Sequence, residues 1–167
     1  MAKVVYQVGD DISTDVIYPG RFMATVLPTE TPLLAFADDA AFNAKLKTKQ
    51  IPPGSILLGG QNFGCGSSRE QAVSCLKGHE LIIVARSFAR IFLQNAINLG
   101  LRIVSCPAIE ANEGDELEVL ATAVLNKSSG KEFPIVPLPR SRQAIIDAGG
   151  LIPFTRKRLV EGELAAR

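Results

Sequence analysis

The stretch Ile56-Leu57-Leu58-Gly59-Gly60-Gln61-Asn62-Phe63-Gly64-Cys65-Gly66-Ser67-Ser68-Arg69-Glu70 predicts a strand, a glycine-rich loop and the start of a helix. The apolar run at residues 56–58 is typical of a buried strand, and Ser67 with Glu70 matches the S-x-x-E capping box. The first turn of a helix leaves N–H groups unpaired at the positive end of its dipole, which suits a small anion. Arg69 adds a charge that can bind a carboxylate through two hydrogen bonds. We therefore expect an anion site here, although a simple helix cap would also explain Ser67.

Two common phosphate-binding loops do not match this stretch. A Walker loop needs lysine after its second glycine, whereas Cys65 follows Gly64. The G-x-G-x-x-G fingerprint needs a small residue at position 69, which is arginine, and no acidic residue follows at the required distance. The glycine loop therefore disfavours a nucleotide ligand.

Composition indicates an ordinary globular protein. The chain has 167 residues, of which 47% are hydrophobic and 21% are charged, and we expect a single domain over residues 1–167. A net charge of +1 provides no broad basic field, so we expect neither a nucleic-acid nor a membrane partner. No apolar run approaches the roughly 18 residues of a membrane span, and the N-terminus lacks a signal-peptide core, which favours a cytoplasmic location.

Cysteine and histidine are too few for common metal sites. Cys65, Cys75 and Cys106 are odd in number and lack C-x-x-C spacing, so we expect no disulfide framework and no metal or iron-sulfur site on this chain. The single histidine, His79, follows Gly78 before a predicted strand, and a structural role is expected for it.

Strands and helices alternate through the first two thirds of the chain. We expect strands at residues 4–8, 56–58, 81–85 and 101–105, and helices at residues 33–46, 68–77 and 88–99. Ser87 is expected to cap the helix that Gly100 ends. This order predicts βαβ crossovers and a mainly parallel sheet, with ligands beyond the carboxyl ends of its strands.

The last third has a different character. Strand-like residues at 116–119 and 133–136 flank a turn at residues 126–130, which predicts antiparallel strands. A short helix at residues 141–148 should end at Gly149-Gly150, and the basic residues 156–158 should form a solvated face. The expected class is α/β, with a mostly parallel central sheet and additional antiparallel strands.

Four motifs in order closely resemble one family, the small subunits of 3-isopropylmalate dehydratase, which are similar to the swivelling C-terminal domain of aconitase. The motifs are residues 9–15 (Gly-Asp-Asp-Ile-Ser-Thr-Asp), 19–21 (Pro-Gly-Arg), 62–70, and 87–100 with Ser87-Phe88-Ala89-Arg90 and Asn95-Ala96-Ile97-Asn98. The resemblance covers nearly the whole chain. It implies the β/β/α swivelling fold of the aconitase C-terminal domain.

The resemblance also implies an activity and a partner. The family's enzymes are hydro-lyases that isomerise 2-isopropylmalate and 3-isopropylmalate in leucine biosynthesis, a reaction on a 2-hydroxy dicarboxylate. A base must take the C–H proton, cations must bind the carboxylates, and a Lewis acid must assist the departing hydroxyl. The family's Lewis acid is a 4Fe-4S cluster on a separate large subunit, which this chain would need as its partner.

Site residues follow from the resemblance, motif by motif. Ser67 falls on the proton-abstracting serine, and Asp15 is the second catalytic residue, placed to orient an arginine. The substrate-binding residues would be Ser68, Arg69, Arg21 and Thr14. In this chain Gln71 stands where the family usually has histidine, which alters any hydrogen bond made at that position.

The loop Phe22-Met23-Ala24-Thr25 is expected to select the substrate. Homoaconitase-type subunits carry an arginine for an additional carboxylate where Ala24 stands here. An uncharged residue suits an alkyl substituent, so isopropylmalate fits best. The alternatives are a related dehydratase, of the 2,3-dimethylmalate or homoaconitase type, and a non-catalytic anion-binding domain of the same fold.

Overall fold

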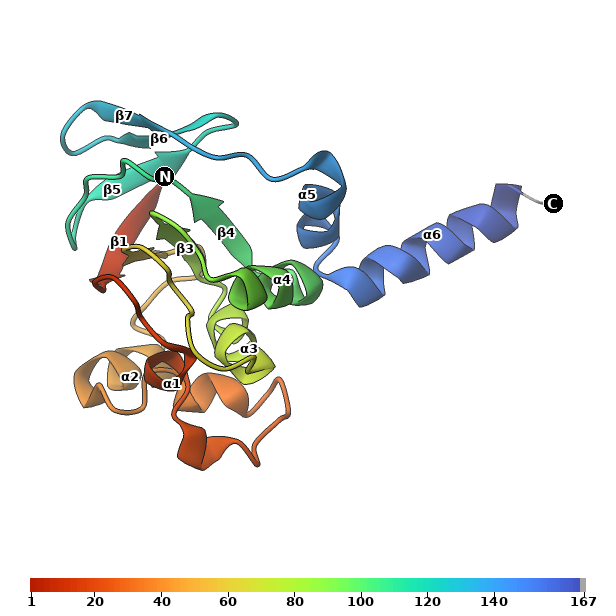
Figure 1. Cartoon of the computed structure of the whole chain (residues 1–167), viewed down its shortest axis with the longest axis horizontal. Coiled ribbons are helices and arrows are strands. Elements are labelled where there is room, and N and C mark those ends of the chain that lie inside the picture. Colours follow the sequence, from red (N-terminus) through yellow and green to blue (C-terminus); the bar gives the residue numbers. More distant parts are fainter. Residues whose placement is uncertain (166–167) are drawn as a thin grey trace.

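The computed structural model describes the backbone of residues 1–165 and the side chains of residues 1–161 (Figure 1). Seven strands form one sheet in the order β4-β3-β2-β1-β5-β6-β7. Its parallel part consists of β1 (Ala2–Gln7), β2 (Ile56–Gly59), β3 (Ile82–Ala85) and β4 (Arg102–Ser105). Its antiparallel part consists of β5 (Glu116–Val119), β6 (Ala123–Asn126) and β7 (Lys131–Pro134). The predicted α/β class, with antiparallel strands added to a parallel sheet, is confirmed.

Helices cover one face of the parallel part, and residues from β5 to β7 cover the other. The helices are α1 (Thr14–Ile17), the 3-10 helices η1 (Gly20–Phe22) and η2 (Thr31–Leu34), α2 (Ala40–Lys47), α3 (Glu70–Gly78), α4 (Arg90–Leu99), α5 (Arg140–Asp147) and α6 (Leu151–Ala165). Figure 1 shows α6 extending away from the rest of the molecule. Within residues 1–165, no helix has the length and apolarity needed to cross a bilayer.

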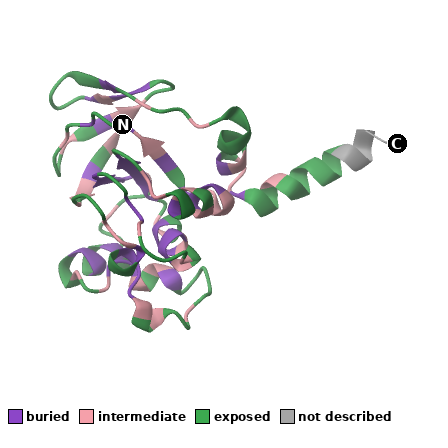
Figure 2. Ribbon diagram, in the orientation of Figure 1, coloured by how far each residue is buried: buried purple, intermediate pink, exposed green. Residues whose placement is uncertain are grey.

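Both faces of the central strands are buried, as Figure 2 shows for the middle of the molecule. Leu57 and Ile83 belong to a core cluster shared with α1 to α4. Ile56 and Val84, which point the other way, belong to a second cluster with residues from β5 to β7. Two covered faces explain why these strands are apolar without alternation. Each fully buried side chain of this kind stabilises the fold by about 1.5–3 kcal/mol.

The helix predicted at residues 33–46 is only partly correct. α2 begins at Ala40, because the Asp39 carboxylate caps it by accepting from the Phe42 N–H at 3.0 Å. Phe36 lies before the helix in left-handed backbone, with a φ of 49°, and is buried against Tyr6 and Phe42. The apolar spacing there reflects an aromatic cluster and not a longer helix.

The C-terminal third contains two elements that the sequence interpretation missed. The first is β6: the sequence predicted two antiparallel strands on either side of the turn at residues 126–130, but this turn joins β6 to β7, and β5 is a third antiparallel strand. Residues 151–165 form α6, and the basic residues 156–158 on it are exposed, as predicted for a solvated face. Assignment of residues 1–167 to a single domain stays a prediction, and residues 166 and 167 lie outside the described part.

Gly100 ends α4 as predicted and also sets how three helices meet. Its φ is 75°, and a Cβ at this position would lie 2.3 Å from the carbonyl carbon of Gly149. The Lys77 ammonium, at the end of α3, donates to the carbonyls of Leu99 and Gly149. The close backbone contact at Gly100 therefore joins the ends of α4 and α5, and the Lys77 side chain joins the end of α3 to both.

All three cysteines are free thiols in different surroundings. Cys75 and Cys106 are buried in different core clusters, and Cys65 is half-buried in the glycine-rich loop. Burial raises the pKa of the Cys106 thiol to about 11 and raises the pKa of Cys75 as well. Thiols dispersed over two core clusters and a loop do not fit the ligand set of an iron-sulfur cluster.

We expect Gly100→Ala to destabilise the chain more than Gly130→Ala. Both glycines are left-handed, but nothing lies within 4 Å of a Cβ at Gly130. The control should lose only the conformational term, about 1–2 kcal/mol, and Gly100→Ala should lose about 1–3 kcal/mol more from the contact with Gly149. Urea unfolding followed by circular dichroism measures both, and equal losses would contradict the proposed contact.

Alkylation should distinguish the three thiols. In the folded protein, iodoacetamide at pH 8 should modify Cys65 and leave Cys75 and Cys106 unmodified, because the latter two are buried and protonated. In urea all three should react. Peptide mass spectrometry gives the modified positions, and rapid native modification of Cys75 or Cys106 would argue against this packing.

Candidate active site

Three loops at the carboxyl ends of β1, β2 and β3 build the site. We call them the β1 loop (residues 9–15), the glycine loop (residues 60–69) and the β3 loop (residues 86–89). The β1 loop continues the pairing of β1 with β2 beyond the sheet. Its backbone bonds are Gly60 N–H to Gly9 O (3.1 Å), Asp11 N–H to Gln61 O (2.9 Å), Gly64 N–H to Ile12 O (2.7 Å) and Thr14 N–H to Cys65 O (2.8 Å).

Side chains of the β1 loop reinforce this pairing. Asp10 Oδ1 accepts from the Gln61 N–H at 2.7 Å, and Asp11 Oδ1 accepts from Asn62 Nδ2 at 2.8 Å. The sequence interpretation gave neither aspartate a function. Their position directly after a strand was the available signal, since aspartate favours turns and accepts from nearby N–H groups.

The β3 loop holds the other side of the glycine loop. The Phe63 N–H donates to Ser87 O at 3.0 Å, and the Ala89 N–H donates to Phe63 O at 2.9 Å. The Ser87 hydroxyl accepts from the Asn62 N–H at 2.8 Å. The predicted cap of α4 by Ser87 is therefore wrong: Ala89 is the N-cap residue, and Ser87 binds the glycine loop.

The predicted capping box at Ser67 is also wrong. α3 begins at Glu70, its N-cap residue is Arg69, and no side chain of the described residues caps it. Ser67 lies two residues earlier, where its Oγ is 3.4 Å from Thr14 Oγ1. Pairing of the glycine loop with the β1 loop, through the Thr14 N–H to Cys65 O bond, places Ser67 before the helix and beside Thr14, so Arg69 and not Ser67 is the N-cap residue.

This correction leaves a series of N–H groups open. Among the described residues, the N–H groups of residues 66–71 donate to no protein acceptor. Ser67 and Ser68 are exposed beside them, so an anion can approach. Open N–H groups at the positive end of a helix dipole are the predicted anion site.

Thr14 is buried, with 1% of its surface exposed. Its Oγ1 donates to the Ser67 carbonyl at 3.1 Å and lies beside the Ser67 hydroxyl. A side chain so completely covered contacts Ser67 and not solvent. The structure therefore brings Thr14 to the site as a neighbour of Ser67.

Arg69 and Asp15 form an ion pair across the two loops. The Arg69 side chain is only 16% exposed, and its guanidinium also lies 3.4 Å from the Tyr18 carbonyl. Gly20 packs against the pair: a Cβ there would lie 3.2 Å from Asp15 Oδ1 and 3.3 Å from Arg69 Nη2. The pair fixes the direction of the guanidinium beside the open N–H groups.

Arg21 lies on η1 and is bound elsewhere. It forms an exposed ion pair with Asp38, which lowers the pKa of that carboxyl, and it stacks on the Phe22 ring at 4.6 Å. In the described structure Arg21 contacts neither Ser67 nor Arg69. Of the two predicted carboxylate-binding arginines, one thus stands at the helix start and one beside it on η1.

Tyr18 fastens the predicted selectivity loop, residues 22–25. This residue is buried, and its hydroxyl lies 3.2 Å from the Phe22 carbonyl and 3.1 Å from the Thr25 carbonyl. Met23 and Ala24, between these attachment points, are exposed. The sequence interpretation missed Tyr18, and an aromatic residue directly before Pro19-Gly20-Arg21 was its only signal.

Two further residues are placed plainly. His79 Nε2 lies 2.8 Å from the Pro32 carbonyl and connects the end of α3 to η2, which is consistent with the structural role expected for it. Gln71 lies in the first turn of α3, half-buried, and its amide makes no hydrogen bond within the described part.

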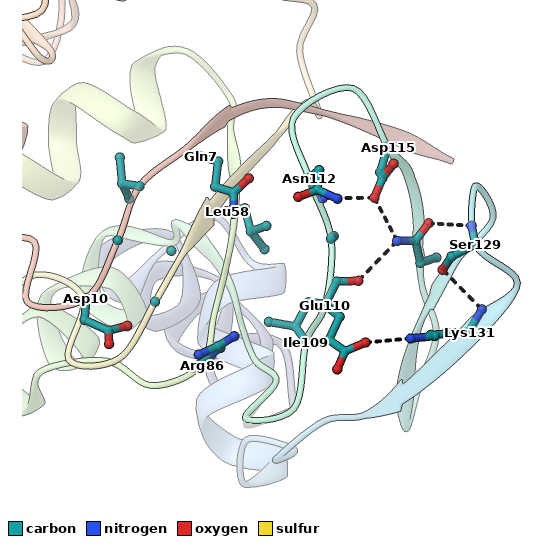
Figure 3. Close-up of a pocket in the computed structure, with 16 residues that line it drawn as sticks. Gln7, Asp10, Leu58, Arg86, Ile109, Glu110, Asn112, Asp115, Ser129 and Lys131 are labelled. Carbon is teal, nitrogen blue, oxygen red and sulfur yellow. Dashed lines mark hydrogen bonds and ion pairs between the residues drawn. The ribbon is translucent and has the colours of Figure 1, made fainter.

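A separate pocket of about 460 Å³ lies beside the start of the glycine loop (Figure 3). Asp10 and Gly60 line it, whereas Ser67 and Arg69 do not. Its polar groups largely satisfy one another: Lys131 pairs with Glu110, and the buried Asn126 amide donates to Glu110 O and to Asp115. The pocket is therefore separate from the predicted anion site.

Known proteins match this chain over the residues that build the candidate site. The family model described as aconitase C-terminal domain matches residues 11–108, which include the glycine loop, the β3 loop and residues 11–15 of the β1 loop. The 3-isopropylmalate dehydratase small subunit of Thermodesulfovibrio yellowstonii is 42% identical over 161 residues, covering 93% of each chain. The isopropylmalate/citramalate isomerase small subunit of Methanocaldococcus jannaschii is 41% identical over 165 residues, covering 95% of each.

A solved structure gives the same relationship. The crystal structure of 3-isopropylmalate dehydratase from Methanocaldococcus jannaschii superposes with a TM-score of 0.85 at 34% identity, covering 96% of both chains. Sequence and fold thus agree over nearly the full length. The chain belongs to the aconitase C-terminal domain family, among the small subunits of 3-isopropylmalate dehydratase.

Proposed function

We propose that this chain is the small subunit of a hydro-lyase that interconverts 2-isopropylmalate and 3-isopropylmalate by removing and re-adding water, and that it acts only with a large subunit. The observation that carries the proposal is the exposed Ser67 beside the open N–H groups of residues 66–71 and the fixed Arg69. The names of the matching relatives support the substrate.

Ser67 would act as the base. Dehydration breaks a C–H and a C–O bond, and the proton would pass to Ser67 Oγ. A serine hydroxyl is too weakly acidic to be an alkoxide in water, so its anion needs strong local stabilisation. The open N–H groups, the α3 dipole and the Arg69 charge all act in that direction.

Thr14 would support this base and not bind substrate directly. Its one proton lies between the Ser67 carbonyl at 3.1 Å and the Ser67 hydroxyl at 3.4 Å. It can therefore turn toward Oγ when negative charge develops there, and a hydrogen bond to the charged form favours that form. Burial keeps the Thr14 side chain beside Ser67.

Arg69, Ser68 and Arg21 would bind the substrate carboxylates. Asp15 holds the Arg69 guanidinium in one direction, which leaves its remaining N–H groups to face a ligand. Arg21 is engaged by Asp38, but an ion pair exposed to solvent contributes little stability, so a substrate carboxylate can replace it.

The Lewis acid is assigned to the partner. The dispersed thiols of this chain do not fit a cluster, so a 4Fe-4S cluster would lie on the large subunit. When bound there, it would assist departure of the substrate hydroxyl. Ser67 and Arg69 must then face the large subunit across the substrate.

Ala24 would select an alkyl substituent over a third carboxylate. An exposed, uncharged residue offers no partner to an extra carboxylate, which would stay unpaired once the subunits close over it. The relative named as an isopropylmalate/citramalate isomerase favours one second substrate, citramalate, with a smaller substituent. Turnover of isopropylmalate, citramalate, dimethylmalate and homocitrate by the reconstituted pair tests the assignment, and preference for homocitrate would overturn it.

A non-catalytic anion-binding domain is the competing interpretation. It predicts tight carboxylate binding by the isolated chain and no turnover with any large subunit. Isothermal titration of the isolated chain with isopropylmalate, alongside the reconstituted assay, separates the two. The ion pair of Arg69 with Asp15 and the exposure of Ser67 favour catalysis.

Replacement of the base should remove turnover without loss of the fold. In the reconstituted enzyme, Ser67→Ala should lower kcat by about 10²- to 10⁴-fold, the usual contribution of a positioned base. The free energy of unfolding should change by less than about 0.5 kcal/mol, because Ser67 is exposed. Ser141→Ala, an exposed serine on α5, is the control and should keep full activity. Turnover above a tenth of the wild-type rate would reject Ser67 as the base.

A lysine cannot replace the arginine fork. Arg69→Lys keeps the charge but loses the bidentate geometry and part of the contact with Asp15, so kcat/KM should fall by about 10- to 100-fold. Steady-state kinetics across isopropylmalate concentrations measures this fall. Arg142→Lys, on the exposed surface of α5, should leave kcat/KM unchanged. Equal effects of the two substitutions would argue against carboxylate binding by Arg69.

A further inference from the structure

Asn95 on α4 contacts the loop that carries the base, although it stands 27 residues away in sequence. Its Nδ2 donates to the Ser68 carbonyl at 3.3 Å. The partner is a carbonyl oxygen, so the amide nitrogen and not the amide oxygen must face it. We propose that Asn95 is a positioning residue, which directs the backbone N–H groups beside Ser67 toward the reacting anion; this inference rests on the function proposed above.

Planarity of the peptide bond gives this contact its effect. The carbonyl and the N–H of one trans peptide point in opposite directions. A hydrogen bond from Asn95 to the Ser68 carbonyl therefore directs the Arg69 N–H away from α4. In the same way, before negative charge develops on Ser67, the bond from Thr14 to the Ser67 carbonyl directs the Ser68 N–H.

Two side chains from opposite sides thus hold two successive peptides. Thr14 belongs to α1 and Asn95 to α4. The segment that they hold, residues 67–69, makes no backbone hydrogen bond to a neighbouring strand. Neither the Ser68 nor the Arg69 N–H has an acceptor among the described residues. Held carbonyls with open N–H groups are the arrangement expected of a preorganised anion site.

The glycines before this segment make such support necessary. Gly64 and Gly66 have φ values of 81° and 91°; Gly64 packs against Phe92, whereas a Cβ at Gly66 would meet only Thr14 and Ser13, at ordinary contact distances of 3.5 Å and 3.6 Å. Glycine has no side chain that restricts its backbone, so Gly66 allows several backbone conformations. Without the bond from Asn95, the Ser68–Arg69 peptide can rotate, and its N–H then leaves the site.

Asn98 provides a matched control on the same helix. It is also an asparagine of α4, but its Oδ1 accepts from Gln94 at 3.0 Å and it makes no contact with the glycine loop. Asn95→Ala and Asn98→Ala remove the same atoms from the same helix. Asn95→Asp keeps the shape of the side chain but has no donor when ionised, which separates the hydrogen bond from packing.

The first measurement uses the isolated full-length chain. Backbone ¹⁵N relaxation should give lower order parameters for residues 66–70 in Asn95→Ala and Asn95→Asp, and wild-type values in Asn98→Ala. Unchanged order parameters in both Asn95 variants would overturn the proposal. This result does not depend on the reaction, so it stands even if the reconstituted wild-type enzyme has no isomerase activity and the proposed function fails.

The second measurement uses the enzyme reconstituted with its large subunit. Both Asn95 variants should lower kcat by about 10- to 100-fold, the effect of a small misplacement of reacting groups. KM should change by less than about threefold, because Asp15 and not Asn95 holds the Arg69 side chain. Tm should match that of Asn98→Ala. A fall in Tm with kcat unchanged would show a purely structural role and reject the proposal.

Discussion

Backbone pairing that continues past the end of the sheet is the constraint on which the site depends. β1, β2 and β3 are parallel, so their carboxyl ends meet at one edge, and the three loops that follow are close from the outset. Hydrogen bonds on both sides of the glycine loop, to the β1 loop and to the β3 loop, then fix its backbone. Two of the proposed functional contacts join the β1 loop to the glycine loop, Asp15 with Arg69 and Thr14 with Ser67, and the contact of Asn95 with Ser68 joins α4 to the glycine loop.

The order of elements could be predicted because the parallel strands are covered on both faces. Residues 56–59 and 82–85 are buried and apolar, and glycine or serine marks the ends of the intervening helices. Caps could not be predicted in the same way. Ser67 and Ser87 match capping patterns, but both hydroxyls contact a neighbouring loop, and a tertiary contact of this kind is invisible to a local pattern. α6 was missed because the sequence of residues 151–165 has no single apolar face; Leu151, Ile152, Leu159 and Val160 are all exposed.

The motifs identified the family and predicted most of the residues of the candidate site, whereas the residues that support them needed the structure. Ser67, Arg69 and Asp15 stand in recognisable motifs and are brought together. Tyr18, Ser87 and Asn95 contact backbone carbonyls or N–H groups. Every residue has these groups, so the partners of such contacts leave no recognisable pattern in one sequence. The error over Ser67 is informative in its own right. A capping serine would accept from one of the N–H groups of the proposed anion site, so the position of Ser67 outside the helix leaves all of them open.

The buried Tyr18 attaches the predicted selectivity loop, residues 22–25, through its backbone and not through its side chains. Tyr18 bonds to the carbonyls of Phe22 and Thr25, which every amino acid possesses, and leaves Met23 and Ala24 free of that attachment. Side chains at these two positions can therefore diverge during evolution while the backbone of the loop keeps its course. A duplicated gene could acquire a new substrate range through one or two substitutions there, with the base, the arginines and the fold inherited intact.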